Sequence, residues 1–148
     1  MISGIHHVAI SSPDIENLEK FYCEQFGFRR VSSFDWKDND QDAALILQVK
    51  RSSGKAVIIK LGGIALELLE FHEPESRRKS EDWSVVDHGL THMCFEVDDC
   101  QAEYSRLKAA GMEFHCVPQD DPDGGSYVYG RDPDGNVVEM WQLADQKE

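Results

Sequence analysis

The sequence lacks any long apolar run, and this absence excludes a membrane-spanning helix. Its apolar stretches, such as Ala56-Val57-Ile58-Ile59 and Ile64-Ala65-Leu66, fall far short of the roughly 20 residues that such a helix needs. The first seven residues also lack the basic segment and apolar stretch of a secretory signal peptide. We therefore expect a cytoplasmic protein that has no membrane partner.

Cysteine and basic residues are also scarce. The four cysteines include no Cys-x-x-Cys spacing, so neither a zinc ribbon nor a redox motif is indicated. Lys and Arg number 15 against 28 Asp and Glu, which gives a formal net charge of −13. Nucleic-acid binding depends on clustered Lys and Arg, so the composition argues against a nucleic-acid partner. The 148 residues, 41% of them hydrophobic, suit one globular domain with a real core.

The most informative feature that is present is an internal repeat. The segment from Ile5 to Asp14 aligns with the segment from Leu90 to Asp99, and His7 falls on His92, an offset of 92 − 7 = 85. Each segment is a short apolar strand that ends in a polar turn and leads into a helical pattern. Each helical pattern stops at a glycine, and the two glycines are 111 − 27 = 84 residues apart. The register of the repeat therefore holds through the helix.

Strand signals follow the helix in each copy. In the first copy they cover about 30–36, then 43–49 or 56–61, and 64–71; in the second they cover about 113–117, 126–130 and 137–143. Turn signals such as Asp132-Pro-Asp-Gly-Asn136 separate them. This order predicts an α+β fold of two tandem βαβββ modules. We expect one domain over 1–148, with modules at about 1–72 and 89–145 and a polar linker at 73–88.

Each copy also carries one histidine and one carboxylate at matching places. His7 and His92 stand on the two opening strands, while Glu67 and Glu139 stand within the apolar runs of the two closing strands. Any one of these residues alone would fit a structural role. An unpaired carboxylate inside a sheet, however, costs roughly several kcal/mol and needs a partner. The duplicated His-Glu pair is therefore interpreted as a metal site made of His7, Glu67, His92 and Glu139.

Two imidazoles and two carboxylates suit one borderline divalent ion, namely zinc, nickel, cobalt, manganese or ferrous iron. A substrate can chelate such an ion through two neighbouring oxygens. The ion then stabilises the negative charge that forms on oxygen when a neighbouring carbon loses a proton. A carboxylate that loosens from the ion can take this proton, so Glu139 or Glu67 is expected to double as the base. The pattern indicates no organic cofactor.

These residues resemble the vicinal oxygen chelate (glyoxalase-like) superfamily over nearly the whole chain. The matching segments are Ile5 to Ile10 before a helix, Ala65 to Leu69, Gly89 to Asp98 and Arg131 to Glu139, of which the last two are the most specific. The resemblance implies that the paired modules form a cupped mixed sheet around the metal. By motif, it also implies that the family's ligand positions fall on the four residues named above.

Within the superfamily, a full set of two His and two Glu is similar to that of glyoxalase I (lactoylglutathione lyase). The strand motifs are also close to methylmalonyl-CoA epimerase, which often has Gln where Glu67 stands. Both reactions pass through an enediolate or enolate, so the resemblance implies a metal-dependent lyase or isomerase acting on a small carbonyl substrate. The alternatives are a non-catalytic small-molecule binding protein of the resistance type and a non-haem iron dioxygenase, which would leave Glu67 uncoordinated.

The partners implied are a small-molecule substrate and a second copy of the chain. Small superfamily members often pair, so the resemblance implies a homodimer whose site lies within one chain or is shared between two. The segment 32–56 shows no residues that match a glutathione or coenzyme A site. The candidate substrate contacts, each of which a surface or core role also explains, are the cations Arg51, Lys55 and Arg131 and the aromatic pair Tyr127 and Tyr129.

Overall fold

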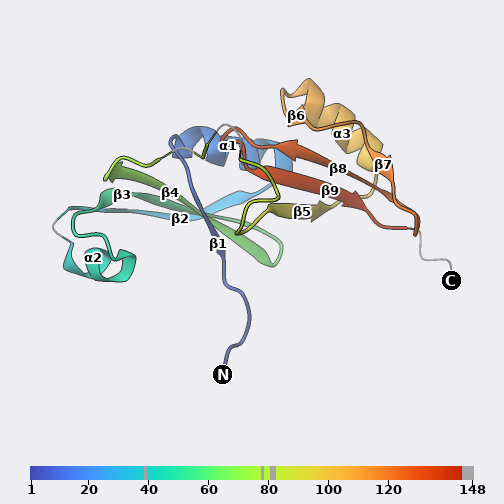
Figure 1. Ribbon diagram of the computed structural model, residues 1–148. Helices are drawn as coiled ribbons and strands as arrows, with labels where there is room; N and C mark the ends of the chain where they lie inside the picture. Colours follow the sequence, from blue (N-terminus) through green and yellow to red (C-terminus); the bar gives the residue numbers. More distant parts are fainter. Residues whose placement is uncertain (39, 78, 81–82, 145–148) are drawn as a thin grey trace. The chain divides into compact units, whose positions relative to one another are not determined.

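The computed structural model describes residues 1–38, 40–77, 79–80 and 83–144. The chain divides into two units, Met1–Lys79 and Ser80–Glu148, which run from blue through green and from yellow to red in Figure 1. The boundary between them falls inside the segment 73–88 that was predicted as a linker. Residues 78, 81 and 82 of that predicted linker, and residue 145 at the end of the second predicted module, lie outside the described residues.

The first unit is a four-stranded mixed sheet with one long helix on one side. Its strands are β1 (Val8–Ser11), β2 (Arg29–Trp36), β3 (Ser53–Leu61) and β4 (Ile64–Glu73), in the spatial order β1-β4-β3-β2. β1 runs parallel to β4, and the other neighbours are antiparallel. The helix α1 (Ile15–Phe26) follows β1, and the short helix α2 (Gln41–Leu47) connects β2 to β3.

The second unit repeats this arrangement. Its strands are β5 (His92–Glu96), β6 (Glu113–Phe114), β7 (Gln119–Asp120), β8 (Ser126–Arg131) and β9 (Val137–Gln142), and its helix is α3 (Cys100–Ala109). The spatial order is β5-β9-β8-β6, with β7 also paired to β8. In this order β5 is equivalent to β1, β9 to β4, β8 to β3 and β6 to β2. The predicted α+β fold of two βαβββ modules with mixed sheets is confirmed.

Both long helices begin with the same two devices. Asp14 and Asp99 each accept a hydrogen bond from the backbone N–H three residues later, at 3.0 and 2.9 Å, and so act as N-caps. From the closing strands, Glu70 and Gln142 each accept a hydrogen bond from the first N–H of the helix, both at 2.9 Å. These two residues lie 142 − 70 = 72 apart, the same offset as the predicted ligands Glu67 and Glu139. The repeat therefore includes the tether between helix and sheet.

Three details of the predicted strands were wrong. The alternative strand at 43–49 lies largely in α2, because Asp40 accepts a hydrogen bond from the N–H of Ala43 at 3.0 Å and caps a helix there. The strand predicted at 113–117 stops at Phe114, and the unpredicted β7 follows after Pro118, a residue that has no N–H to give to a strand ladder. The opening strand starts at Val8, the first residue that pairs with β4.

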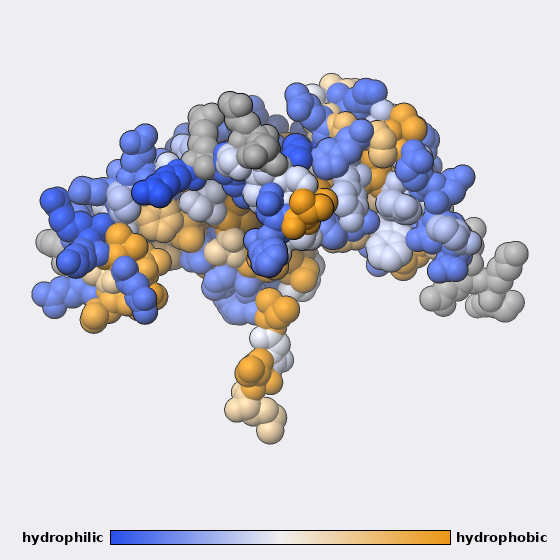
Figure 2. All heavy atoms as spheres, in the orientation of Figure 1, coloured by the Kyte–Doolittle hydropathy of each residue, from blue (hydrophilic) through white to orange (hydrophobic). Residues whose placement is uncertain are grey.

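Exposed apolar side chains gather in two stretches of the first unit. α2 buries none of its residues, and its Leu45 and Ile46 are 75% and 81% exposed. Near the N-terminus, Met1, Ile2 and Ile5 are also exposed, and Figure 2 shows both stretches as apolar surface. In the described part of the chain, no helix combines the length and the apolar character that crossing a membrane would require.

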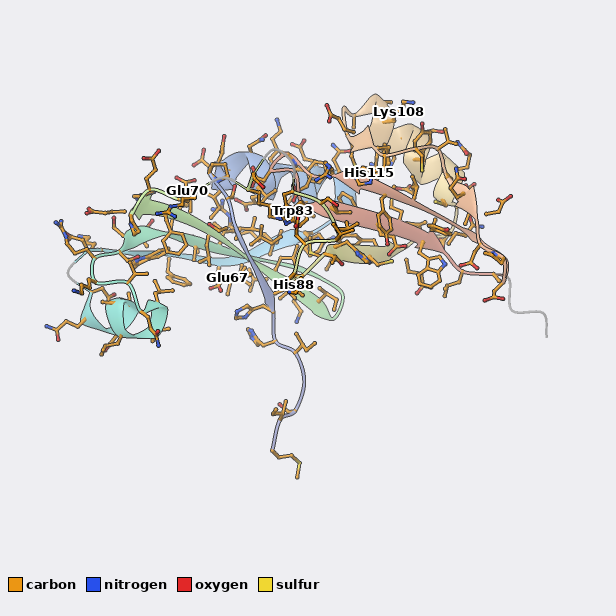
Figure 3. All side chains as sticks on the ribbon, viewed as in Figure 1. Glu67, Glu70, Trp83, His88, Lys108 and His115 are labelled. Carbon is orange, nitrogen blue, oxygen red and sulfur yellow. The ribbon has the colours of Figure 1, made fainter. Side chains whose placement is uncertain are left out.

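Each sheet uses one side for packing against its long helix. The side chains buried there are Val57, Ile59, Leu66 and Leu68 under α1, and Val128, Val138 and Met140 under α3. Each such burial contributes about 1.5–3 kcal/mol to stability. The alternate residues of the same strands point to the other side, which we call the far face of the sheet. Figure 3 shows this for β4, where Glu70 lies on the helix side and Glu67 on the far face.

Candidate metal centre

The first unit brings two of the predicted ligands together on its far face. His7 directly precedes β1. Glu67 lies on β4, where it is the register partner of Ala9 on β1. The Nε2 atom of His7 lies 3.2 Å from Oε2 of Glu67, and their side chains are 36% and 17% exposed. The other ring nitrogen of His7, Nδ1, lies 2.8 Å from Nδ1 of His6. Both nitrogens of the His7 ring therefore have polar neighbours.

The second unit makes the equivalent pair. His92 begins β5, Glu139 lies on β9, and Nε2 of His92 is 3.1 Å from Oε2 of Glu139. The Glu139 side chain is 10% exposed and that of His92 29%. The Nδ1 atom of His92 lies 2.8 Å from the Thr91 hydroxyl oxygen. Such a contact fixes the ring so that Nε2 points to the carboxylate, which is the usual supporting arrangement of a metal-ligating histidine.

The two glutamates differ in their neighbours across the strands. Glu67 has Ala9 and Ile58 beside it, whereas Glu139 has Cys94 and Tyr129. Partial burial, followed by a hydrogen bond to Glu139 and by the charges of Glu139 and Glu96, raises the pKa of the Cys94 thiol to about 12. Partial burial and then the Glu139 charge also raise the pKa of Tyr129. Both groups beside Glu139 therefore keep their protons at neutral pH.

Each pair has the separation that two adjacent ligands of one ion need. With bonds of about 2.0–2.2 Å and ligand–metal–ligand angles between octahedral and tetrahedral values, neighbouring ligand atoms lie roughly 2.8–3.6 Å apart. The observed Nε2–Oε2 separations of 3.2 and 3.1 Å fall in this range. Among the described residues, no group of three or more His, Cys, Asp and Glu side chains is gathered in one place. The meeting of both pairs at one ion stays a prediction.

Two of the predicted substrate cations already have carboxylate partners. Arg51 Nη2 lies 2.9 Å from Oδ2 of Asp38 and 3.7 Å from Oε2 of Glu73. Lys55 Nζ lies 3.5 Å from Oε1 of Glu16, on the side of the sheet that α1 covers. These ion pairs favour the surface role that the sequence also allowed for both residues.

The remaining candidates, Tyr127, Tyr129 and Arg131, share the far face of the second sheet with Glu139. They alternate along β8, where Tyr129 is the register partner of Glu139. The Tyr129 ring also lies 5.0 Å from the His92 ring, between centroids. These three side chains therefore line the surface around the second pair.

His115, which was not among the predicted site residues, also lies on this face. Its backbone N–H donates to the Tyr129 carbonyl at 2.9 Å, and the two ring centroids are 6.3 Å apart. Partial burial first, and then the Arg131 charge, lower the pKa of His115. The sequence did contain a signal for this position. His115 comes two residues after Glu113, which begins β6, and alternate residues of a strand share a face.

Comparison with known proteins gives the chain its family. The family model described as "Glyoxalase/Bleomycin resistance protein/Dioxygenase superfamily" matches residues 4–140. The chain is 25% identical to the uncharacterized protein YaeR of Escherichia coli over 95% of this chain and 97% of that protein. It is 26% identical to a 2-epi-5-epi-valiolone epimerase of an Actinomyces species, over 95% and 79% of the two chains.

The fold is similar to that of solved glyoxalase-like structures. The crystal structure of a glyoxalase family protein from Bacillus cereus superposes with a TM-score of 0.87 at 17% identity, covering 97% of this chain and 96% of that one. At this level of identity the likeness shows the fold alone, and the family model covers most of the same residues. The chain therefore belongs to the glyoxalase/bleomycin resistance protein/dioxygenase superfamily.

Proposed function

We propose that this protein is a metal-dependent isomerase or lyase that removes a proton beside the carbonyl group of a small substrate. The observation that supports this most is the duplicated His-Glu pair, with Nε2–Oε2 separations of 3.2 and 3.1 Å on the far faces of two equivalent sheets. A single pair would fit a structural hydrogen bond. Two pairs at equivalent strand positions, each with metal-ligand spacing, favour a ligand set.

We propose that His7, Glu67, His92 and Glu139 together hold one divalent ion of the zinc, nickel, cobalt, manganese and iron group. When bound, such an ion stabilises negative charge on the substrate oxygen. The carboxylate of Glu139 or Glu67 takes the proton from the neighbouring carbon. The Thr91 hydroxyl keeps the His92 ring in the orientation that its 2.8 Å contact defines.

The epimerase relative favours the isomerase form of this proposal. The Actinomyces protein is named for an epimerase activity and matches 95% of this chain. An epimerase inverts a stereocentre when it removes a proton and returns it to the other face of the same carbon. The other face can be protonated only by a group that lies on that face, so of the two carboxylates Glu67 and Glu139 one would accept the proton and the other, itself protonated, would donate one.

Metal content of protein purified without chelator or affinity tag tests the ligand set. We expect about one divalent ion per chain by elemental analysis, and its loss in the His7→Ala, His92→Ala double variant. The matched control is His72→Ala, because His72 lies near Glu70 on β4 and outside the proposed set. Wild-type protein that carries no ion, and gains no thermal stability from added zinc, nickel, cobalt or manganese, would contradict the proposal.

Proton exchange tests the chemistry. The metal-loaded protein would be incubated in D2O with 2-epi-5-epi-valiolone, with methylmalonyl-CoA, and with the hemithioacetal of methylglyoxal and glutathione. We expect metal-dependent deuterium incorporation beside the carbonyl of a substrate, detected by NMR and abolished in the double variant. Tight metal-dependent binding of such compounds without exchange would instead support a non-catalytic binding protein.

A further inference from the structure

The far face of the second sheet carries an arginine at a defined place beside the His92–Glu139 pair. Val137 on β9 is the register partner of both His92 on β5 and Arg131 on β8. Arg131 therefore lies level with His92, two strands away. Neighbouring strands are about 4.8 Å apart, so the two backbones are separated by about 10 Å. A long side chain can cover much of that distance toward a molecule held near the His92–Glu139 pair.

The Arg131 guanidinium is held in place and, in the part of the chain that the structure describes, has no carboxylate partner. Its Nη1 donates to the Gly135 carbonyl at 2.7 Å, and its guanidinium carbon lies 5.8 Å from the centroid of the Trp83 ring. Among the described residues, no carboxylate forms an ion pair with it, not even its register neighbour Glu113. An arginine has five N–H donors, so a fixed guanidinium here keeps donors for another group.

The side chains around Arg131 suit a planar anion. Tyr129 lies between Arg131 and Tyr127 along β8, and its ring contacts both His92 and His115. The lowered pKa of His115, caused by partial burial and by Arg131, leaves this ring neutral at pH 7 and able to donate one hydrogen bond. Trp83 and His115, both labelled in Figure 3, belong to the same unit as Arg131.

The other unit provides an internal comparison. Lys60 pairs with Ala65, two residues before Glu67, as Arg131 pairs with Val137, two residues before Glu139. The equivalent position is therefore cationic in both units. The two aromatic residues, however, have no aromatic equivalents in the first unit: Ile58 occupies the position equivalent to Tyr129, and Ala56 the position equivalent to Tyr127. Within the described residues, Lys60 has neither ring contact nor hydrogen bond to fix its ammonium group, so it lacks the ordered surroundings of Arg131.

We propose that Arg131, together with His115 and Tyr129, binds a carboxylate group of the substrate at a distance from the reacting carbonyl. The substrate class is then a carbonyl compound with a distal carboxylate. A carboxylate, with its single negative charge, fits better than a phosphate, because Arg131 is the one cation that the described strands β5, β6, β8 and β9 place on this face in a chain of net charge −13. Its guanidinium can pair with a carboxylate through two parallel hydrogen bonds. This inference rests on the proposed function, in which the His92–Glu139 pair helps to hold the reacting end.

Two probes that differ only at the distal group test the inference. We would measure by calorimetry the binding of 2-oxoglutarate and of its distal methyl ester, 5-methyl 2-oxoglutarate, to zinc-loaded protein. We expect the diacid to bind at least about tenfold more tightly, the usual advantage of a charge-assisted pair. Arg131→Gln should abolish this preference, while Arg106→Gln should retain it. Arg106 is a matched control, because it lies on α3 of the same unit and pairs with Glu103.

The outcomes separate this inference from the proposed function. Equal affinities of the two probes for wild-type protein, or a preference lost in Lys60→Gln and kept in Arg131→Gln, would overturn the distal site alone. Zinc-independent binding of the methyl ester would argue against the metal chemistry alone. For that case a second readout uses metal-free protein, in which the Arg131 Nε–H NMR signal should shift with the diacid and stay unchanged with the methyl ester. A signal that moves with neither probe overturns the site.

Discussion

The two His-Glu pairs have the same geometry but different neighbouring residues. Both histidines direct Nε2 toward a glutamate at 3.1–3.2 Å, so the first contact is the same in each unit. The next contacts differ, because Glu67 has apolar strand neighbours and Glu139 has Cys94 and Tyr129. Substitutions at equivalent positions of the two units will therefore have unequal effects.

The Thr91 hydroxyl should matter for metal affinity although it is no ligand. Thr91→Val removes its 2.8 Å contact with Nδ1 of His92 and frees the imidazole to rotate. Loss of such a supporting contact weakens metal binding by about 10–100-fold. Competition against a chromophoric zinc chelator would measure the change. Thr91→Ser keeps the hydroxyl and should bind within about threefold of wild type; an equal loss in both variants would contradict this role.

The Cys94 thiol should react slowly in metal-free protein. Its pKa is raised to about 12 by partial burial, by the Glu139 hydrogen bond and by the charges of Glu139 and Glu96. Only the thiolate is nucleophilic, so its alkylation rate should climb about tenfold per unit between pH 8 and 10. Mass spectrometry after iodoacetamide treatment would follow this, and Glu139→Gln should accelerate it. A rate that levels off below pH 9 would contradict the raised pKa.

The close approach of β2 and β4 to β3 requires a glycine at position 54. A Cβ added at Gly54 would lie 2.3 Å from the Glu70 carbonyl oxygen and 2.5 Å from the ring of Trp36. Trp36 is itself fixed, because its Nε1 donates to the Ser52 hydroxyl at 2.8 Å and its ring contacts Phe71. An added methyl group would have to displace both the β4 backbone and the Trp36 ring. The packing of β2, β3 and β4 therefore leaves no room for a side chain at this position.

Gly54→Ala should therefore destabilise the protein by about 3 kcal/mol, near the upper end of what overpacking usually costs. Urea denaturation would measure the loss. Gly63→Ala is the matched control, since an added Cβ there meets nothing within 4 Å, and its stability should stay within about 1 kcal/mol of wild type. Equal stabilities of the two variants would show that Trp36 moves aside at little cost.

The elements also show how far the sequence could predict the structure. Local spacing in the sequence was enough to predict three features. These are the repeat, the N-caps at Asp14 and Asp99, and the alternation of buried and far-face residues in β4 and β9. The segment 43–49 was ambiguous, since a short apolar run fits a strand or a helix equally well; the cap at Asp40 decided for α2. The two-residue strands β6 and β7 depend on pairing with the distant β8, which no local pattern reveals.

The candidate site was predictable to the same extent. The four proposed ligands were found through the repeat, and the structure brings them together as two pairs. His115 was missed, because its contact with Tyr129 depends on the register between β6 and β8. Arg131 was only one of three candidate cations in the sequence. The ion pairs of Arg51 and Lys55 separate it from the other two.

For the whole molecule, the formal charge of −13 should make stability depend on salt. Mutual repulsion of the acidic side chains opposes folding, and added salt screens it over about 10 Å at 0.1 M. In metal-free protein, raising NaCl from about 20 to about 300 mM should therefore raise Tm by roughly a few degrees. Differential scanning calorimetry would show this, and choline chloride should act equally. A falling Tm would mean that attractive pairs dominate.

The division of each sheet into a helix side and a far face has a consequence for how this protein can change. The packing beneath the helices comes from Val57, Leu68, Val138 and their neighbours, whereas the proposed chemistry uses alternate positions of the same strands. Variation at Ile58, Tyr127 or Tyr129 can therefore alter which compounds are accepted while the packed side is left intact. A library restricted to these far-face positions should remain largely folded, so new selectivities could be sampled without first rebuilding the scaffold.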